Sequence, residues 1–193
     1  YLLNILNYFE SIILNKEVAN NIINTSFVKL FISLMDVDNV DICIRACSII
    51  ANLIRYVTSM QHSLDEYNLT SKLIAFIKAE NVNVMLNRKA IATLGEYFFF
   101  VATQVEGDNA SLHHQWNIMS TTESINALLY ALTHNDEVVR FYALKTIENT
   151  VILTNVAKAY FASNDEFINR ISEIYFNEHY DNIEIKTSAL NTI

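Results

Sequence analysis

The cysteines and histidines are the residues of this chain best suited to bind a metal ion or to transfer a proton. Cys43 and Cys47 lie four positions apart, so on a helix both thiols face the same side. A tetrahedral zinc site needs four ligands, and no second cysteine or histidine pair stands nearby to complete one. His113 and His114 are adjacent and would point about 100° apart on a helix. We therefore expect the cysteines to pack in the core, and we predict no metal site and no cofactor.

Catalytic signatures are missing as well. The chain has two glycines, Gly95 and Gly107, too few for the phosphate-binding loop of a P-loop protein or the glycine-rich loop of a kinase. No Gly-x-Ser-x-Gly, His-Glu-x-x-His or Cys-x-x-Cys spacing occurs. The sequence therefore predicts no catalytic residues in this segment and points to binding as its task.

An alanine recurs through the chain inside a loosely repeated pattern. The four positions are Ala46, Ala90, Ala143 and Ala189, separated by 44, 53 and 46 residues. An Asn or Asp stands seven residues before each alanine, and an aliphatic residue stands four residues after it. A helical period of about 40–47 residues is typical of HEAT and armadillo arrays, whose units bury their apolar faces against each other. We predict a right-handed α-solenoid of about four HEAT/armadillo-type repeats, continuous over residues 1–193.

The chain is expected to be almost entirely helical because it has no proline and few glycines. Apolar residues at helical spacing predict helices over about 1–14, 18–35, 39–57, 64–79, 82–105, 122–133, 136–153, 156–162, 165–176 and from 182 onward. Asp136 and Asp165 occupy predicted N-cap positions, and Arg140 follows Asp136 by one turn, which suggests structural roles for this pair. Residues 105–121 form an insertion without clean periodicity, which we expect to be either a variable surface connection or a functional loop.

Composition and charge narrow the class of partner. Residues 1–100 carry eight cations and nine acids, net −1, and residues 101–193 carry five and twelve, net −7. This acidic half disfavours nucleic acid and favours a basic partner surface, although solubility alone would also explain it. The sequence also predicts no membrane span, and two cysteines do not form a disulfide framework, so we expect a cytoplasmic setting. The missing initiator methionine leads us to expect an excerpt of a longer protein.

Two asparagines follow their recurring alanines by six residues, namely Asn52 and Asn149. The run from Ala46 to Leu53 resembles the third helix of an armadillo repeat. The resemblance implies that such asparagines line a groove and hydrogen-bond the backbone of an extended peptide. It is partial, because Glu96 replaces the middle asparagine. The groove tryptophan of the family would fall at Ser48, Ala92 and Lys145.

Four aromatic residues in a row, Tyr97 to Phe100, form the densest apolar feature of the chain. Helical register places Tyr97 and Phe98 on the core stripe, whereas Phe99 and Phe100 turn toward other faces. Either the helix is buried on several sides, or an exposed aromatic patch awaits a partner. We expect Phe99 to be the exposed member, with Phe100 and Trp116 as further candidates for partner contact.

The segment 88–104 also resembles the C-terminal helical-repeat region of the unc-51-like and Fused-related kinases, especially the ciliary pseudokinase member. The runs Arg88 to Ala90, Leu94 to Glu96 and Val101 to Gln104 carry this resemblance. It implies a non-catalytic docking scaffold on microtubule-based structures such as the cytoskeleton or a cilium. Two alternatives stay open: an armadillo groove that binds extended basic peptides, and a regulatory domain of an active Ser/Thr kinase.

Overall fold

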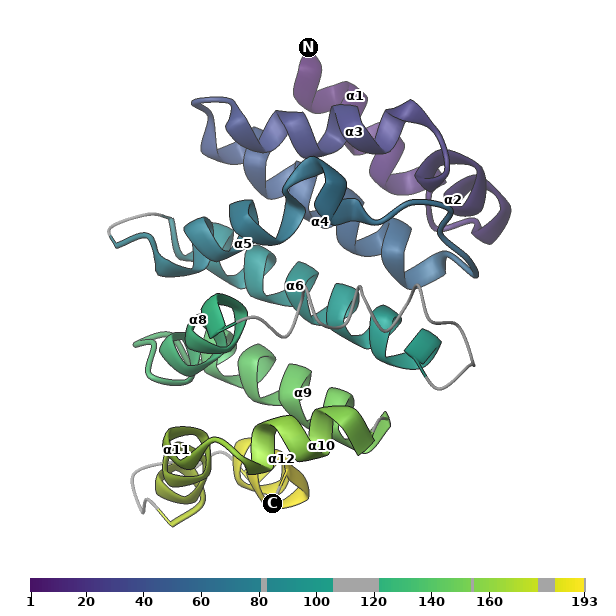
Figure 1. Cartoon of the computed structure of the whole chain (residues 1–193). Coiled ribbons are helices and arrows are strands. Elements are labelled where there is room, and N and C mark those ends of the chain that lie inside the picture. The colour runs from purple at the N-terminus through teal and green to yellow at the C-terminus, as the bar shows by residue number, and fades with distance from the viewer. Residues whose placement is uncertain (81–82, 106–121, 154, 177–182, 193) are drawn as a thin grey trace. The chain divides into compact units, whose positions relative to one another are not determined.

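The computed structural model describes residues 1–80, 83–105, 122–153, 155–176 and 183–192, and every regular element in these ranges is a helix (Figure 1). The chain divides into two compact units, Tyr1–Tyr97 and Phe98–Ile193. The boundary falls inside one continuous helix, α6 (Val84–Val105).

Unit 1 contains a three-helix repeat. Its elements before α6 are α1 (Leu2–Ile12), α2 (Lys16–Ile23), α3 (Ser26–Ser33), the 3-10 helix η1 (Leu34–Asp36), α4 (Val40–Tyr56), the 3-10 helix η2 (Leu64–Tyr67) and α5 (Leu69–Lys78). Helices α2, α3 and α4 pack against one another in all three pairs, and α1 packs against α4. The long helix α4 thus buries its apolar face under three shorter helices.

The prediction of one continuous helix over residues 18–35 is wrong, because α2 ends and α3 begins within this range. The hydroxyl of Thr25 accepts a hydrogen bond from the Phe27 amide at 3.3 Å and donates one to the Ile22 carbonyl at 2.7 Å. The chain turns by 83° between α2 and the segment Ser26–Asp36. A side-chain cap therefore ends one helix and starts the next without proline or glycine, and apolar periodicity does not register such a break.

The helix expected over residues 64–79 is also divided. Asn68 adopts a left-handed conformation, with φ 59° and ψ 34°, between η2 and α5. Asparagine is one of the few residues that tolerate this region. Leu64, Leu69 and Leu73 are all buried, so both segments contribute to the core.

Unit 2 repeats the arrangement. Its elements after α6 are α8 (Thr122–Leu132), α9 (Glu137–Leu153), α10 (Asn155–Ala162), α11 (Asp165–Phe176) and α12 (Ile183–Thr192). Helices α8, α10 and α12 pack against α9, and α11 packs against both α10 and α12. Asp136 caps α9 as predicted, accepting a hydrogen bond from the Val139 amide at 3.1 Å. The predicted cap of α11 is one residue off, because Asn164 accepts from the Phe167 amide at 3.0 Å.

The recurring alanines lie at fully buried positions in both units. Ala46, Ala90, Ala143 and Ala189 have no exposed surface and lie on α4, α6, α9 and α12. Cys43 and Cys47 are free thiols buried in α4, as expected for core residues. Burial raises the pKa of Cys47 to about 12, which keeps this thiol protonated and unreactive at neutral pH.

Membrane-spanning potential is weak in the described ranges. No single helix there is long and apolar enough to cross a bilayer. Only α2 joined to the segment Ser26–Asp36 passes on length and composition, as a sharply bent pair.

Candidate functional site

A stripe of residues in one register recurs on the long last helix of the repeats. Its positions follow the recurring alanine by two, six and nine residues, a spacing that places them on one helical face. We call these positions the third-helix stripe: Ser48, Asn52 and Arg55 on α4; Ala92, Glu96 and Phe99 on α6; Lys145, Asn149 and Ile152 on α9. On each helix the middle residue is half-buried and the last is exposed.

The two stripe asparagines have unoccupied side-chain amides. Asn52 and Asn149 are half-buried, and within the described ranges neither amide makes a hydrogen bond. By contrast, the amide of Asn20 donates to the Lys16 carbonyl at 2.8 Å and accepts from the Thr58 amide at 3.0 Å. Asn52 and Asn149 therefore each keep a donor and an acceptor available at the surface of a rigid helix.

In unit 1 an ion pair joins neighbouring stripes on α4 and α6. Arg55 donates from Nε to Oε1 of Glu96 at 3.1 Å, and its Nη2 contacts the same oxygen. The two helices are also linked in the interior, where Thr93 donates a hydrogen bond to the Cys47 carbonyl at 3.0 Å. Glu96, which stands at the expected asparagine position, is thus held by the arginine of the preceding repeat.

The stripe of α4 begins at a buried hydroxyl. Ser48 stands where the resemblance to an armadillo repeat would place a tryptophan, and its Oγ has no hydrogen-bond partner within the described ranges. Nearer the start of α4, unit 1 carries a cleft of about 390 Å³ lined by Leu3, Asn7, Asp41, Ile44, Arg45, Asn83 and Met85. These residues come from α1, α4 and the first turn of α6, apart from Asn83, which directly precedes α6. Arg45 crosses from α4 to Glu10 of α1 at 2.6 Å.

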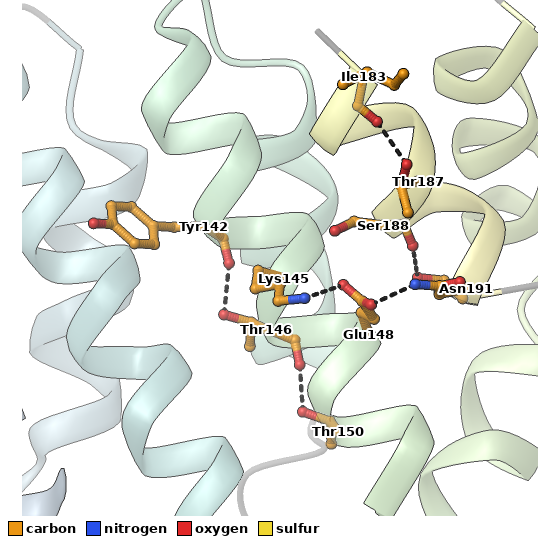
Figure 2. A network of polar contacts seen from close by, with 10 residues as sticks. Tyr142, Lys145, Thr146, Glu148, Thr150, Ile183, Thr187, Ser188 and Asn191 are labelled. Atoms are coloured by element: carbon orange, nitrogen blue, oxygen red, sulfur yellow. Dashed lines mark hydrogen bonds and ion pairs between the residues drawn. The ribbon is translucent and has the colours of Figure 1, made fainter.

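In unit 2 a buried carboxylate ties the stripe of α9 to α12. Figure 2 shows Lys145 and Asn191 on opposite sides of Glu148. The Lys145 amine and the Asn191 amide each donate a hydrogen bond to this carboxylate, both at 2.8 Å. Burial alone would raise the pKa of Glu148, but hydrogen bonds from Lys145, Asn191 and Ser188 outweigh it and lower that pKa below its ordinary value. Glu148 is therefore ionised at neutral pH and fixes α9 against α12.

A second cleft in unit 2 lies at the carboxyl end of the α9 stripe. It measures about 460 Å³ and is lined by Val151, Ile152, Lys158, Phe161, Ala162, Phe167, Ile168, Asn191 and Thr192. Six of the nine lining residues are apolar, and the other three are Lys158, Asn191 and Thr192. Ile152 belongs both to this cleft and to the stripe, and Lys158, Phe161 and Ala162 of α10 line the same cleft.

The aromatic run on α6 contributes one exposed side chain. Phe99 is 41% exposed, whereas Phe100 is only 8% exposed and Tyr97 and Phe98 are fully buried. Phe100 is therefore corrected from a candidate contact to a core residue, because the helix is buried on that face too. Trp116 lies outside the described residues, as do His113, His114 and the rest of the insertion from residue 106 to 121. Phe99 and the asparagines remain candidates for partner contact.

The described residues do not assemble a metal centre. Within these ranges no group of three or more His, Cys, Asp or Glu side chains is placed to hold an ion. The hydroxyl of Tyr97 lies 3.1 Å from Ser63 Oγ. Burial, and to a lesser extent the nearby charge of Asp65, raises the pKa of Tyr97, so this hydroxyl stays protonated and forms a structural contact with Ser63.

Reasoning from sequence missed the ion pairs that accompany the stripe. Arg55 stands at the ninth position after its alanine, as do Phe99 and Ile152, and this register was the available signal. The contact of Glu148 with Asn191 had no such signal, because the two residues are 43 positions apart.

The fold is shared with solved structures, whereas no family model and no curated protein matches the chain. A computationally designed armadillo repeat protein made for modular peptide recognition is 16% identical, with a TM-score of 0.71, covering 99% of this chain and 74% of that one. A second engineered protein is 13% identical, with a TM-score of 0.50, covering 99% and 90%. Together with its helical architecture, this similarity confirms the predicted fold class: the chain is an all-α solenoid of armadillo-type repeats.

Proposed function

We propose that this chain is a non-catalytic protein-interaction scaffold that binds an extended peptide segment along its third-helix stripes. The observation that carries the proposal is the pair of free, half-buried amides of Asn52 and Asn149 at equivalent positions of two repeats. A rigid helix that offers an unsatisfied amide at the surface is suited to bind another polar group.

An extended peptide has the chemistry that these amides require. Its backbone presents one N–H donor and one C=O acceptor per residue, and nothing within the peptide satisfies them. A primary amide side chain can accept a hydrogen bond from the N–H and donate one to the C=O of the same peptide. One asparagine can therefore hold one residue of the peptide, whatever side chain that peptide residue carries. The similar designed armadillo protein was made for modular peptide recognition, which supports this use of the fold.

Binding to a library of ten-residue peptides tests the proposal, with Asn52→Ala and Asn149→Ala compared with the intact chain. Loss of a backbone hydrogen bond worth about 0.5–1.5 kcal/mol should weaken binding about 2- to 12-fold for every peptide that binds the affected unit. The matched control is Asn21→Ala, which removes an exposed asparagine from α2. If both stripe variants bind all peptides as the intact chain does, the peptide-groove function is refuted.

The cellular setting that we propose rests on the resemblance of segment 88–104 to the repeats of Fused-related and unc-51-like kinases. In that setting the chain would be a docking region of a kinase-like protein on a microtubule-based or ciliary structure. Expression of a tagged chain in ciliated cells tests this part: localisation along cilia or microtubules supports it, and diffuse staining argues against it. Kinase motifs in the coding sequence ahead of Tyr1 would favour the regulatory-domain alternative.

A further inference from the structure

We infer that the stripe of unit 1 selects an extended peptide with an acidic side chain beside the backbone held by Asn52, and that Arg55 recognises this side chain. The inference rests on the proposed function, because it specifies which peptide the asparagine stripe accepts. It departs from the expectation of a basic partner, which followed from the charge of residues 101–193, net −7.

Arg55 is the member of the Arg55–Glu96 ion pair that faces solvent. The side chain of Arg55 is 54% exposed, whereas that of Glu96 is 23% exposed. The guanidinium contacts one oxygen of the carboxylate through two of its nitrogens. A molecule that approaches the stripe of unit 1 therefore meets the arginine before the glutamate.

In two other ion pairs that involve α4 or α9, the cation is again more exposed than the carboxylate. Lys145 on α9 is 43% exposed, and its partner Glu148 is 5% exposed. Arg45 on α4 is likewise more exposed than Glu10. Lys145 belongs to unit 2, so the arrangement arises independently in both units.

Ion pairs on other helices show the reverse order. In unit 1 Asp36 of η1 is 62% exposed and its partner Lys72 of α5 only 20%. In unit 2 both members of the α11 pair lie off the stripe, and Glu173 is more exposed than Arg170. Exposure of the cation is therefore not a consequence of long basic side chains in general, but a feature of the third-helix face.

Geometry places Arg55 within reach of a peptide bound at Asn52. The two residues are three apart on α4, so their Cβ atoms are about 5–6 Å apart on the same face. An extended peptide advances about 3.3 Å per residue, so a side chain one or two residues from the one held by Asn52 lies over Arg55. A carboxylate there would form a charge-assisted hydrogen bond with the guanidinium of Arg55, which also donates to Glu96 through Nε and Nη2.

A peptide carboxylate fits this surface better than the phosphates of a nucleic acid. The stripe positions of unit 1 hold a single cation, Arg55, which is paired with Glu96. Nucleic acids bind through several phosphate contacts to a continuous basic surface, and the chain as a whole carries a charge of −8.

Three labelled repeating peptides test the inference by fluorescence anisotropy: (Glu-Ser)5, (Gln-Ser)5 and (Lys-Ser)5. A two-residue repeat presents its charged side chain in every binding register, so the register need not be known. The intact chain should bind (Glu-Ser)5 about 3- to 10-fold more tightly than (Gln-Ser)5 at low salt, with (Lys-Ser)5 weakest, and added salt should reduce the difference.

The decisive variant exchanges the pair, Arg55→Glu together with Glu96→Arg. It keeps the two opposite charges and the net charge of −8, but it puts the carboxylate at the exposed position. Preference should then switch to (Lys-Ser)5. Lys29→Glu on α3 is the control, since it makes the chain more acidic away from the stripe and should leave the preference for (Glu-Ser)5 in place. Should the exchanged chain not fold by circular dichroism, Arg55→Gln gives the test, with loss of the preference expected.

The outcomes separate this inference from the function on which it rests. If the three peptides bind equally and Asn52→Ala weakens all of them, the peptide groove stands and the acidic preference is wrong. The acidic preference is also wrong if the exchanged chain keeps the preference of the intact chain, or if the intact chain binds (Lys-Ser)5 most tightly. It is wrong as well if the chain binds a twenty-residue oligothymidine and none of the peptides. Absence of any asparagine-dependent peptide binding would remove the proposed function itself.

Discussion

Truncation of Phe98 and of its neighbour Phe99 should have very different effects on stability. Phe98 is fully buried, so Phe98→Ala loses the transfer free energy of the ring and leaves a cavity, at about 3–5 kcal/mol. Phe99 is 41% exposed. With about three-fifths of a full burial worth about 1.5–3 kcal/mol, and no closed cavity, Phe99→Ala should cost about 1–2 kcal/mol.

Urea unfolding followed by circular dichroism measures both variants against the intact chain. The comparison requires equal m-values, because a changed m indicates that the two units no longer unfold together. The account predicts a midpoint for Phe99→Ala well above that for Phe98→Ala. If Phe99→Ala destabilises the chain by about 3–5 kcal/mol, Phe99 is a core residue and is removed from the candidate contacts.

Further predictions concern caps, packing, titration and reactivity. Asp136→Ala should lower the free energy of unfolding by about 0.5–2 kcal/mol while Asp136→Asn, which keeps an acceptor, costs less; equal losses in denaturant unfolding would show that the cap does not matter. Ala90→Leu should destabilise the chain by about 1–3 kcal/mol, since this position has no free surface, and an unchanged midpoint would contradict the close packing. The pKa of Glu148 is lower in the folded chain than in the unfolded chain, so the ionised carboxylate contributes its full stabilisation above the unfolded value near 4.5 and loses it as pH falls through the lower folded pKa. The difference in free energy of unfolding between the intact chain and Glu148→Gln should therefore shrink over that pH range. A constant difference would refute the ionised contact. Cys47 should resist a thiol reagent at pH 8 until the chain unfolds, because burial raises its pKa to about 12; rapid labelling of the folded chain would place it at the surface.

The sequence predicted the helices wherever burial followed a 3.6-residue period. Helices α4, α6 and α9 begin and end within two residues of expectation, and the recurring alanines marked their buried faces. The break at Thr25 escaped because both sides of it are apolar and a single hydroxyl cap divides them. Hydrophobic periodicity detects burial, whereas a helix terminus depends on where a side chain satisfies the backbone.

Part of the candidate site was predictable because it follows the repeat. Asn52 and Asn149 share one register position, and the register places both at the surface of a helix. The pairing of Arg55 with Glu96 depends on which helices pack side by side, and the exposure of each partner depends on tertiary packing. Phe100 was misjudged for the same reason: a helix covered on several sides buries faces that an isolated helical wheel leaves open.

The central claim is that the free amides of the stripe bind a peptide backbone. Side-chain amide resonances of Asn52 and Asn149, assigned by NMR through their alanine variants, report on it directly when the chain is titrated with a binding peptide from the library. The account predicts that the amide of Asn52 or Asn149, whichever unit binds the peptide, shifts at saturation, while that of Asn20, already hydrogen-bonded within unit 1, stays in place. A saturated complex in which neither stripe amide shifts would contradict the account.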